Sequence, residues 1–286
     1  QNIKFLCLSA TIKNKNEFLE WIVSLRGSTS LVYSAIRPTP LEISLVTSSK
    51  IDKKIKIIKS SKDNKNKKIF KFDRQAKQYI KPKLNEQAKY LDSRKLLPVI
   101  FFFFSRERVE SSSRQLANQM SVIPNRNEIK DKYNIVFNDL TPEEINLLNL
   151  DEHMWMWSRG VGFHHAGLAP IVKEFVEYLF LNKYIKYLFA TETLALGINM
   201  PAKSIYIDRL HKYDGIKTRP LTQSEFLQLS GRAGRRGIDD KGFAFLSYDK
   251  NINRDWYSNL FTLKPNDLIS AFSVNYSSIL NLLNLY

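Results

Sequence analysis

The amino-acid sequence predicts an α/β protein built on an open parallel sheet with helices on both of its faces. From residue 97 onward, short apolar runs of strand length alternate with stretches of helical periodicity, which is typical of parallel strands joined by helices. The run at residues 98–105 is almost continuously apolar, as expected of a strand that is buried on both faces. Predicted strands are residues 98–105, 161–165, 187–190, 204–207 and 242–247, and predicted helices are residues 106–120, 170–182 and 223–233.

The residues on either side of this alternating region divide the chain further. Residues 3–10 and 41–46 predict strands, residues 17–25 have helical spacing, and a mostly helical tail is expected after Tyr248. With 286 residues, the chain is long enough for one or two domains. We expect a first segment over residues 1–46, a connector over 47–96, the alternating domain over 97–250 and a last segment over 251–286.

The net charge of +16 favours a polyanion such as nucleic acid or an acidic membrane as partner. Half of this charge comes from the stretch between Lys50 and Lys71, which holds ten lysines and two aspartates. Because the stretch is rich in lysine, asparagine and serine, it predicts a solvated or disordered connector; a nucleic-acid-binding arm is the alternative.

The composition also argues against several other classes of protein. The one cysteine, Cys7, allows no disulfide within the chain, and its apolar neighbours predict that it is buried. The longest apolar run, residues 96–104, is about half the length needed to cross a bilayer, so no membrane span is expected. Because the chain opens with Gln1 and shows no leader-like segment, we expect an excerpt of a longer intracellular protein.

The strongest chemical signal lies in residues 228–237. Thr222 and Glu225 form a capping-box pattern that predicts a helix start near residue 223. Gln228, Arg232 and Arg235 then follow at i, i+4 and i+7, so a continuing helix would present them on one face. Two guanidinium groups suit the terminal phosphate of a nucleotide. An arginine- and glycine-rich nucleic-acid loop is the alternative, and no lysine-serine or lysine-threonine pair follows the glycines, as a phosphate-binding P-loop would require.

Small hydroxyl side chains occur at the ends of several predicted strands. Such groups can hold phosphate oxygens without reading bases, although capping and turn hydrogen bonds are an equal alternative for each one. The residues concerned are Ser9, Thr11, Ser105, Thr191 and Thr193.

These signals belong to a set of segments that resembles the Superkiller/Mtr type of DExH-box RNA helicase. The matching segments are residues 8–11, 37–41, 104–106 with Glu110, 162–168, 190–201, 213–215, 228–237, 270–272 and 279–283. The resemblance implies a RecA-like sheet flanked by helices. It implies that residues 1–46 end a first RecA-like lobe, that 97–250 form the second lobe, and that the helical tail over 251–286 begins a winged-helix domain.

The resemblance also implies roles for individual residues. It implies arginine fingers at Arg232 and Arg235 and a water- or phosphate-orienting Gln228. Gly197 and Asn199 would join the two arginines in binding ATP, and Ser9 and Thr11 would couple hydrolysis to strand separation. The implied RNA-binding residues are Ser105, Arg106, His165, Gly167, Thr191 and Thr193.

By resemblance, the complete protein is expected to hydrolyse ATP with Mg²⁺ and to unwind RNA in the 3′-to-5′ direction. The chain is expected to be inactive as an ATPase by itself, because the phosphate loop and the DExH box would lie upstream. Single-stranded RNA and an exosome, Superkiller or TRAMP-like complex are the implied partners, in the nucleus or the cytoplasm. A spliceosomal or DNA-unwinding relative and a non-catalytic RNA-binding scaffold are the alternatives.

Three further patterns resemble functional sites, and we interpret each of them as structural. Neighbouring His164 and His165 would point to opposite faces of a strand, which argues against a metal site. Residues 151–153 imitate a DExH box but follow residues 8–11, whereas the family's box precedes that segment. Trp155 and Trp157 favour packing over stacking on bases, although stacking is the alternative.

Overall fold

The fold is given by a computed structural model, and it consists of two units that are described separately. One unit comprises residues 1–35 and 264–286, and the other comprises residues 36–263. The structure describes residues 4–9, 12–34, 36–51, 53–62, 68–70, 79–195, 199–249, 252, 256–257, 267–270 and 275–283.

In the smaller unit, the predicted helix is present as α1 (Lys15–Arg26), and the helical tail contains α10 (Tyr276–Leu283). The strand predicted for residues 3–10 is wrong for residues 4–9, which have no regular structure. The described residues of this unit contain no strand that could pair with them, and unpaired backbone groups then remain in water. Phe5 and Leu6 are accordingly exposed, and so is Cys7, for which burial was predicted.

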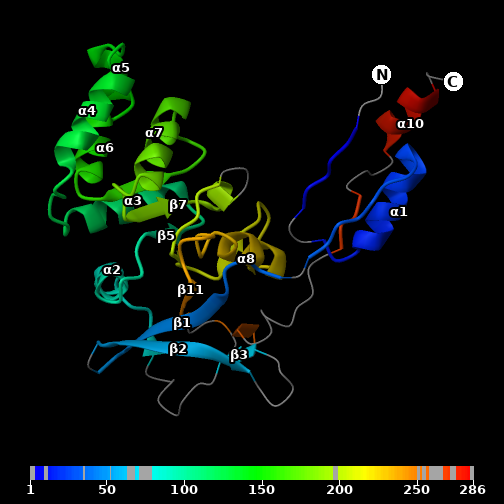
Figure 1. The fold of residues 1–286 in the computed structure, drawn as a ribbon, viewed down its shortest axis with the longest axis horizontal. Helices are drawn as coiled ribbons and strands as arrows, with labels where there is room; N and C mark the ends of the chain where they lie inside the picture. Colours follow the sequence, from blue (N-terminus) through cyan, green and yellow to red (C-terminus); the bar gives the residue numbers. More distant parts are fainter. Residues whose placement is uncertain are drawn as a thin grey trace. The chain divides into compact units, whose positions relative to one another are not determined.

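The larger unit is organised around a mostly parallel sheet. Its described strands are β1 (Leu41–Ser49), β2 (Ile55–Lys62), β3 (Lys68–Phe70), β4 (Tyr79–Ile80), β5 (Val99–Phe102), β6 (Val161–His164), β7 (Tyr187–Ala190), β8 (Ser204–Ile207) and β11 (Gly242–Ser247). Their order is β3-β2-β1-β11-β8-β5-β7-β6, with β4 paired to β1. All neighbours from β1 to β6 are parallel, whereas β2, β3 and β4 pair antiparallel. The predicted open parallel sheet is confirmed (Figure 1).

Helices cover both faces of this sheet. The described helices of the larger unit are α2 (Leu84–Ser93), α3 (Arg106–Ala117), α4 (Arg126–Val136), α5 (Pro142–Leu147), α6 (Leu150–Trp157), α7 (Pro170–Leu181) and α8 (Gln223–Ser230), and a short 3-10 helix, η2, spans Glu192–Ala195. A small hairpin of β9 (His211–Tyr213) and β10 (Thr218–Pro220) lies outside the sheet. Within the described residues, no helix is both long and apolar enough to span a bilayer.

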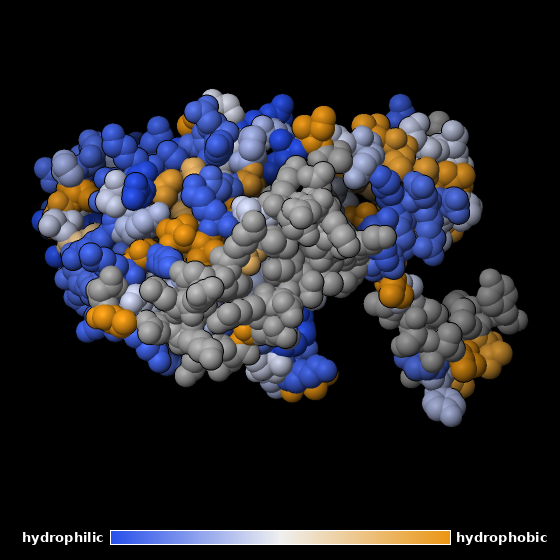
Figure 2. Space-filling model, turned by 90° about the horizontal axis from the view of Figure 1, so that it is seen from below, coloured by the Kyte–Doolittle hydropathy of each residue, from blue (hydrophilic) through white to orange (hydrophobic). Residues whose placement is uncertain are grey.

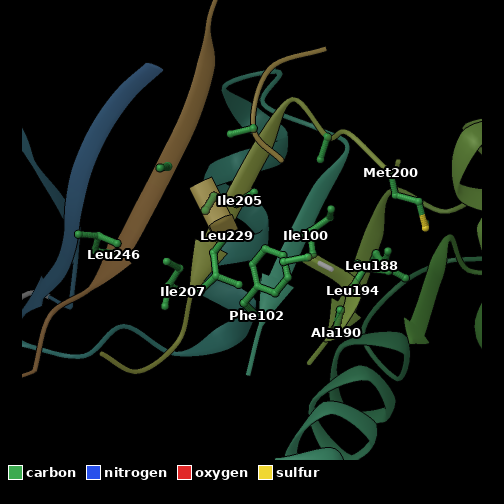
Figure 3. Close-up of a cluster of buried hydrophobic side chains, with 14 of the residues drawn as sticks. Ile100, Phe102, Leu188, Ala190, Leu194, Met200, Ile205, Ile207, Leu229 and Leu246 are labelled. Atoms are coloured by element: carbon green, nitrogen blue, oxygen red, sulfur yellow. The ribbon is translucent and has the colours of Figure 1, made fainter. Parts of the chain in front are cut away.

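Two hydrophobic cores form because successive strand side chains point to opposite faces. Along β5, Ile100 and Phe102 join the core that also contains side chains of α7 and α8, whereas Val99 and Phe101 join the core beneath α2 and α3. Figure 3 shows Leu194 and Leu229 packed among the sheet residues of the first core. These two leucines anchor η2 and α8, which carry candidate site residues.

The structure differs from the predicted segment boundaries. Strand β1 pairs in register with β11, from Leu41 beside Gly242 to Val46 beside Ser247, so the boundary predicted after residue 46 cuts through a strand of the larger unit. The described part of the predicted connector is also not disordered, because it forms β2, β3, β4 and α2. Ile58 and Phe70 provide the reason, since both are buried in the first core. The identity of each unit as a particular domain stays a prediction.

Candidate nucleotide and nucleic-acid site

Most of the predicted RNA-binding residues lie at one edge of the sheet. Ser105, His165 and Thr191 each follow closely on the carboxyl end of a parallel strand, β5, β6 and β7 respectively, and these three strands are neighbours. In open α/β sheets this edge is where ligands bind. The Ser105 hydroxyl caps α3 by accepting a hydrogen bond from the Arg108 amide at 3.4 Å. The geometry therefore places these residues at one edge of the sheet, whereas their contact with RNA stays a prediction.

His165 supports the turn that contains Gly167. The Gly167 amide donates a hydrogen bond to Nδ1 of His165 at 3.1 Å, so Nε2 carries the proton of the neutral ring and donates a hydrogen bond to Glu110 at 3.0 Å. Burial lowers the pKa of His165, which favours this neutral form. Because His165 is only 4% exposed, the outer surface of the turn is formed by exposed Ala166 and Gly167. Arg106 lies against Gly167, with Nη1 3.2 Å from the position that a Cβ would take.

His164 points to the other face of the sheet, as predicted, and its Nε2 lies 2.9 Å from Glu177 of α7. Burial lowers the pKa of His164. In the part of the chain that the structure describes, no group of three or more His, Cys, Asp or Glu residues is arranged to hold a metal ion.

Thr191 and Thr193 begin a short connection that leads from the sheet edge to the second cluster of predicted residues. Their hydroxyl oxygens are 2.8 Å apart, and η2 begins directly after Thr191 and includes Thr193. The carbonyl of Ala195, at the end of η2, accepts a hydrogen bond from Nη2 of Arg232. Asn199 lies a few residues further along, and Gly197 is outside the described residues. The short element η2 thus connects the predicted RNA-binding residues to the predicted ATP-binding residues.

The prediction that Gln228, Arg232 and Arg235 share one helical face is wrong. The capping box of Thr222 and Glu225 is confirmed, but α8 ends at Ser230. Two backbone features turn the chain away from the helix axis. Ala233 forms a parallel bridge with Ala202 beside β8, and Gly234 has a φ of +88°, in the left-handed region that favours glycine. Gln228 therefore lies exposed on the helix, while both arginines lie in the loop that follows it.

Arg37 fastens this loop to the end of α8. Its guanidinium donates to the carbonyls of Ser230 at 3.0 Å, Ala233, and Thr39 at 2.8 Å. Carbonyl groups at a helix end lack partners within the helix, and a cation is well placed to satisfy them. Sequence reasoning matched residues 37–41 to the family without finding this contact, because the partners are more than 190 residues apart.

Gly234 packs so closely that no side chain fits there. A Cβ on Gly234 would lie 2.6 Å from the methyl group of Thr39 and 3.1 Å from the amide nitrogen of Gly242. The loop of Arg232 and Arg235 is thus held between residues 37–41 and the start of β11.

Arg235 is oriented by Asp239, four residues later. Asp239 accepts from Nε and Nη2 of Arg235, each at 2.8 Å, and from its backbone amide at 2.9 Å. Burial alone would raise the pKa of Asp239, but these hydrogen bonds outweigh it, and the pKa of the carboxyl is lowered. Sequence reasoning missed Asp239, although its i, i+4 spacing from Arg235 was a visible signal.

Lys212 of the β9–β10 hairpin joins η2 to α8. Its ammonium lies 2.7 Å from Glu192 and 2.9 Å from Glu225, and Glu225 also pairs with Arg219 at 2.8 Å. Burial opposes the charge on Glu225, yet the hydrogen bonds from Arg219 and Lys212 outweigh it and lower the pKa of the carboxyl. Sequence reasoning missed this network, because its charges lie in four different elements.

The remaining residues singled out in the sequence are structural or lie in the smaller unit. Glu152 holds Arg114 through two hydrogen bonds, at 2.6 and 3.0 Å. The interpretation of Trp157 as a packing residue is confirmed by its complete burial, and Trp155 packs against the second core. Ser9 is exposed in the smaller unit, and Thr11 is outside the described residues, so their predicted coupling role stays a prediction.

Comparison with known proteins gives relatives along nearly the whole chain. No family model matches the chain. It is 37% identical over 311 residues to the DExH-box ATP-dependent RNA helicase DExH10 of Arabidopsis thaliana, and 32% identical over 299 residues to the exosome RNA helicase MTR4 of Homo sapiens. It is also 32% identical over 309 residues to the probable helicase HelY of Mycobacterium tuberculosis.

Each of these matches covers 99% of the chain but only 31%, 29% and 34% of the respective relative. The chain thus spans about a third of the length of the relatives it matches. Because the similarity covers 99% of the chain and the fold agrees with the one that the resemblance implied, the chain belongs, as a segment, to the Superkiller/Mtr type of DExH-box RNA helicases.

Proposed function

We propose that the chain is the second half of the core of an ATP-dependent RNA helicase. One observation carries the proposal: η2 directly follows Thr191 and contains Thr193, on the edge suited to RNA phosphates, and it ends at Ala195, whose carbonyl accepts a hydrogen bond from Arg232. A shift of the RNA-binding residues would be transmitted to the ATP-binding residues, and the reverse, through the four residues of η2. This is the arrangement that an enzyme needs when it couples nucleotide hydrolysis to movement along a strand.

In this proposal, Arg232 and Arg235 act as arginine fingers on the terminal phosphate of ATP. Charge develops on the oxygens of the transferring phosphoryl group, and guanidinium donors stabilise it. Gln228 orients the attacking water, and Asn199 and Gly197 lie beside the nucleotide. By the resemblance, Mg²⁺ would be held with the ATP phosphates mainly by a first RecA-like lobe.

The RNA-binding edge consists of hydroxyl groups, backbone amides and Arg106. Such groups contact phosphates and sugars and not base edges, so we propose binding of single-stranded RNA with little sequence preference. Three finer points rest on the resemblance and on names such as exosome RNA helicase MTR4. They are 3′-to-5′ unwinding, association with an exosome, Superkiller or TRAMP-like complex, and action inside the cell, in the nucleus or the cytoplasm.

The chain alone is expected to bind a labelled single-stranded oligouridylate and to show no ATP hydrolysis. Thr193→Val keeps the size of an exposed side chain while removing its hydroxyl, so it should weaken RNA binding several-fold. Thr141→Val, which changes a threonine outside the edge, is the matched control.

Fluorescence anisotropy measures the binding, and phosphate release measures hydrolysis. ATP turnover by the highly purified chain would contradict the proposed division of the active site. Unchanged RNA binding by Thr193→Val would contradict the proposed edge. In the complete protein, RNA binding without any ATPase activity would favour the non-catalytic scaffold instead.

A further inference from the structure

A cavity of about 530 Å³ lies beside the predicted RNA edge, in a place to which none of the roles above extends. It opens between the start of α2 and the exposed flank of α3, two helices that pack against each other. Its floor includes Phe103 and Asp208, the residues that directly follow β5 and β8. The cavity is therefore located at the carboxyl ends of two neighbouring parallel strands, where open α/β sheets bind ligands.

The charges that line the cavity favour an anion. Lys81, Lys83 and Arg108 line it together with one carboxylate, Asp208, which leaves two positive charges in excess. Asp208 is buried and holds two of the cations. The Lys81 ammonium donates hydrogen bonds to the Asp208 carboxylate and, at 3.0 Å, to the Asp208 backbone carbonyl. Nη2 of Arg108 donates to Oδ2 of Asp208 at 3.1 Å. The cation positions are thus fixed before any ligand enters, which lowers the entropic cost of binding.

Donors remain available after these pairs are made. Nε and Nη1 of Arg108 have no hydrogen-bond partner among the described residues, and the Lys83 ammonium is exposed and likewise without an ion pair there. A second row of polar groups also lines the cavity: Arg108, Ser112 and Gln115 recur at helical spacing along α3, and Gln119 lies in the turn that follows the helix. Glutamine amides both donate and accept, as the edge of a nucleobase requires.

The cavity also continues the predicted path of RNA. Arg108 lies in the first turn of α3, and its backbone amide donates to the hydroxyl of Ser105, the first residue of the predicted edge. The cavity volume exceeds that needed for one nucleotide and falls within the range of small-ligand sites.

We infer that this cavity binds one nucleotide of the same single strand, with its phosphate at Lys83 and Arg108 and its base along Gln115 and Gln119. The inference rests on the proposed RNA binding and extends the binding site beyond the edge at Ser105, His165 and Thr191. The cavity supplies a contact for one further nucleotide, so the stretch of RNA that the chain contacts is one nucleotide longer.

The test compares charge-reversal variants of the chain in binding labelled oligouridylates of increasing length. Lys83→Glu should raise the dissociation constant on the order of 10-fold for strands long enough to reach the cavity, and it should reduce the salt dependence of binding. Lys89→Glu makes the same change of charge on α2, the helix that Lys83 immediately precedes, at an exposed residue outside the cavity, and should have a much smaller effect.

A second variant tests the proposed base contacts without changing charge. Gln115→Ala combined with Gln119→Ala alters two exposed side chains, so it should leave the fold intact, weaken binding several-fold and leave the salt dependence unchanged. In the wild-type chain, affinity should rise in a step as the strand lengthens, and this step should be absent from both cavity variants.

Equal effects of Lys83→Glu and Lys89→Glu would overturn the inference while leaving the RNA edge standing, provided that Thr193→Val still weakens binding. Displacement of the RNA by inorganic phosphate, at a matched ionic strength where chloride has no effect, would identify a site for a free anion and overturn it as well. Absence of any RNA binding by the wild-type chain would reject both the inference and the proposed function.

Discussion

At the scale of single residues, Arg235 shows how a predicted finger can already be engaged before a nucleotide is present. Asp239 uses the edge of the guanidinium that carries Nε and Nη2, and Nη1 is left without a hydrogen-bond partner in the described part of the chain. The group can therefore keep its pair with Asp239 and donate through Nη1 to a phosphate oxygen. A lysine cannot do both, because its ammonium is a single point of charge on a flexible stem.

Arg235→Lys in the complete protein should therefore lower kcat far more than the affinity for ATP or RNA. Arginine fingers contribute about 10³ to 10⁵ in rate, so a loss of about 10³ or more is expected. Arg236→Lys, at an exposed neighbour, is the control and should retain activity. The checks are steady-state ATPase kinetics and the melting temperature of each variant. Near-normal kcat with a lower melting temperature would assign Arg235 a structural role alone.

At the scale of elements, α6 is stabilised by a histidine that must stay neutral. His153 stacks on Trp157 at 5.1 Å and lies 4.7 Å from the ring of Phe163. Its Nδ1 is buried and has no hydrogen-bond partner among the described residues. Burial lowers the pKa of His153 from 6.5 to about 4, because the charged form would lose its hydration.

This histidine predicts a loss of stability in mild acid. Its pKa is lower in the folded than in the unfolded chain, so the unfolded chain binds more protons between pH 6.5 and about 4. The stability that neutral His153 contributes is complete above pH 6.5 and is lost as the pH falls toward 4. From pH 7 to pH 5 the loss from this group should be about 2 kcal/mol.

Urea unfolding at the two pH values, compared between wild type and His153→Phe, measures this contribution. Between pH 7 and pH 5, the unfolding free energy of the variant should fall by about 2 kcal/mol less than that of the wild type. The contributions of the other histidines are the same in both proteins and cancel in the difference. His211→Phe, in the β9–β10 hairpin, serves as the control. An equal pH dependence of wild type and His153→Phe would show that His153 is not the proton-sensitive group.

At the scale of the whole molecule, half of the net positive charge lies in residues 50–71, which include β2 and β3 at one edge of the sheet. Lysines on an edge strand also hinder pairing with another chain, so their presence there has a structural reason. Figure 2 shows a face on which hydrophilic side chains predominate and hydrophobic ones form small, separate patches.

Replacing Lys50, Lys54 and Lys59 by serine should flatten the salt dependence of RNA binding by the chain. Each lost phosphate contact lowers the slope of log affinity against log salt by about 0.7 for a single strand. Serine at Lys130, Lys132 and Lys183 removes the same charge from other exposed positions and is the control. An equal slope in both triple variants would assign these lysines no RNA contact.

The sequence was informative where local pattern decides the structure. The alternation of apolar runs predicted the parallel strands β5, β6, β7, β8 and β11, and the capping box predicted the start of α8. The end of α8 was missed, because Gly234 and the bridge between Ala233 and Ala202 depend on contacts with a distant strand. The pairing of β1 with β11 was missed for the same reason, since it joins residues about 200 positions apart.

The candidate site was predictable to the same extent. Motif resemblance and predicted strand ends gave the candidate residues, and the structure places Ser105, His165 and Thr191 at one edge of the sheet. Sequence pattern could not show that His165 is turned inward to Glu110, or that Arg37 binds the end of α8. Both contacts join elements that only the folded chain brings together.

The short element η2 has a thermodynamic consequence. If Thr191 and Thr193 bind RNA and Arg232 binds nucleotide, both ligands act on the same four residues. Coupling between two binding sites is reciprocal, so the factor by which ATP changes the affinity for RNA must equal the factor by which RNA changes the affinity for ATP. A non-hydrolysable ATP analogue and a short RNA can each be titrated into the complete protein in the presence and in the absence of the other. The four dissociation constants must then agree with a closed thermodynamic cycle. The hydrogen bond from Arg232 to Ala195 is then a term in that coupling free energy and not in either affinity alone.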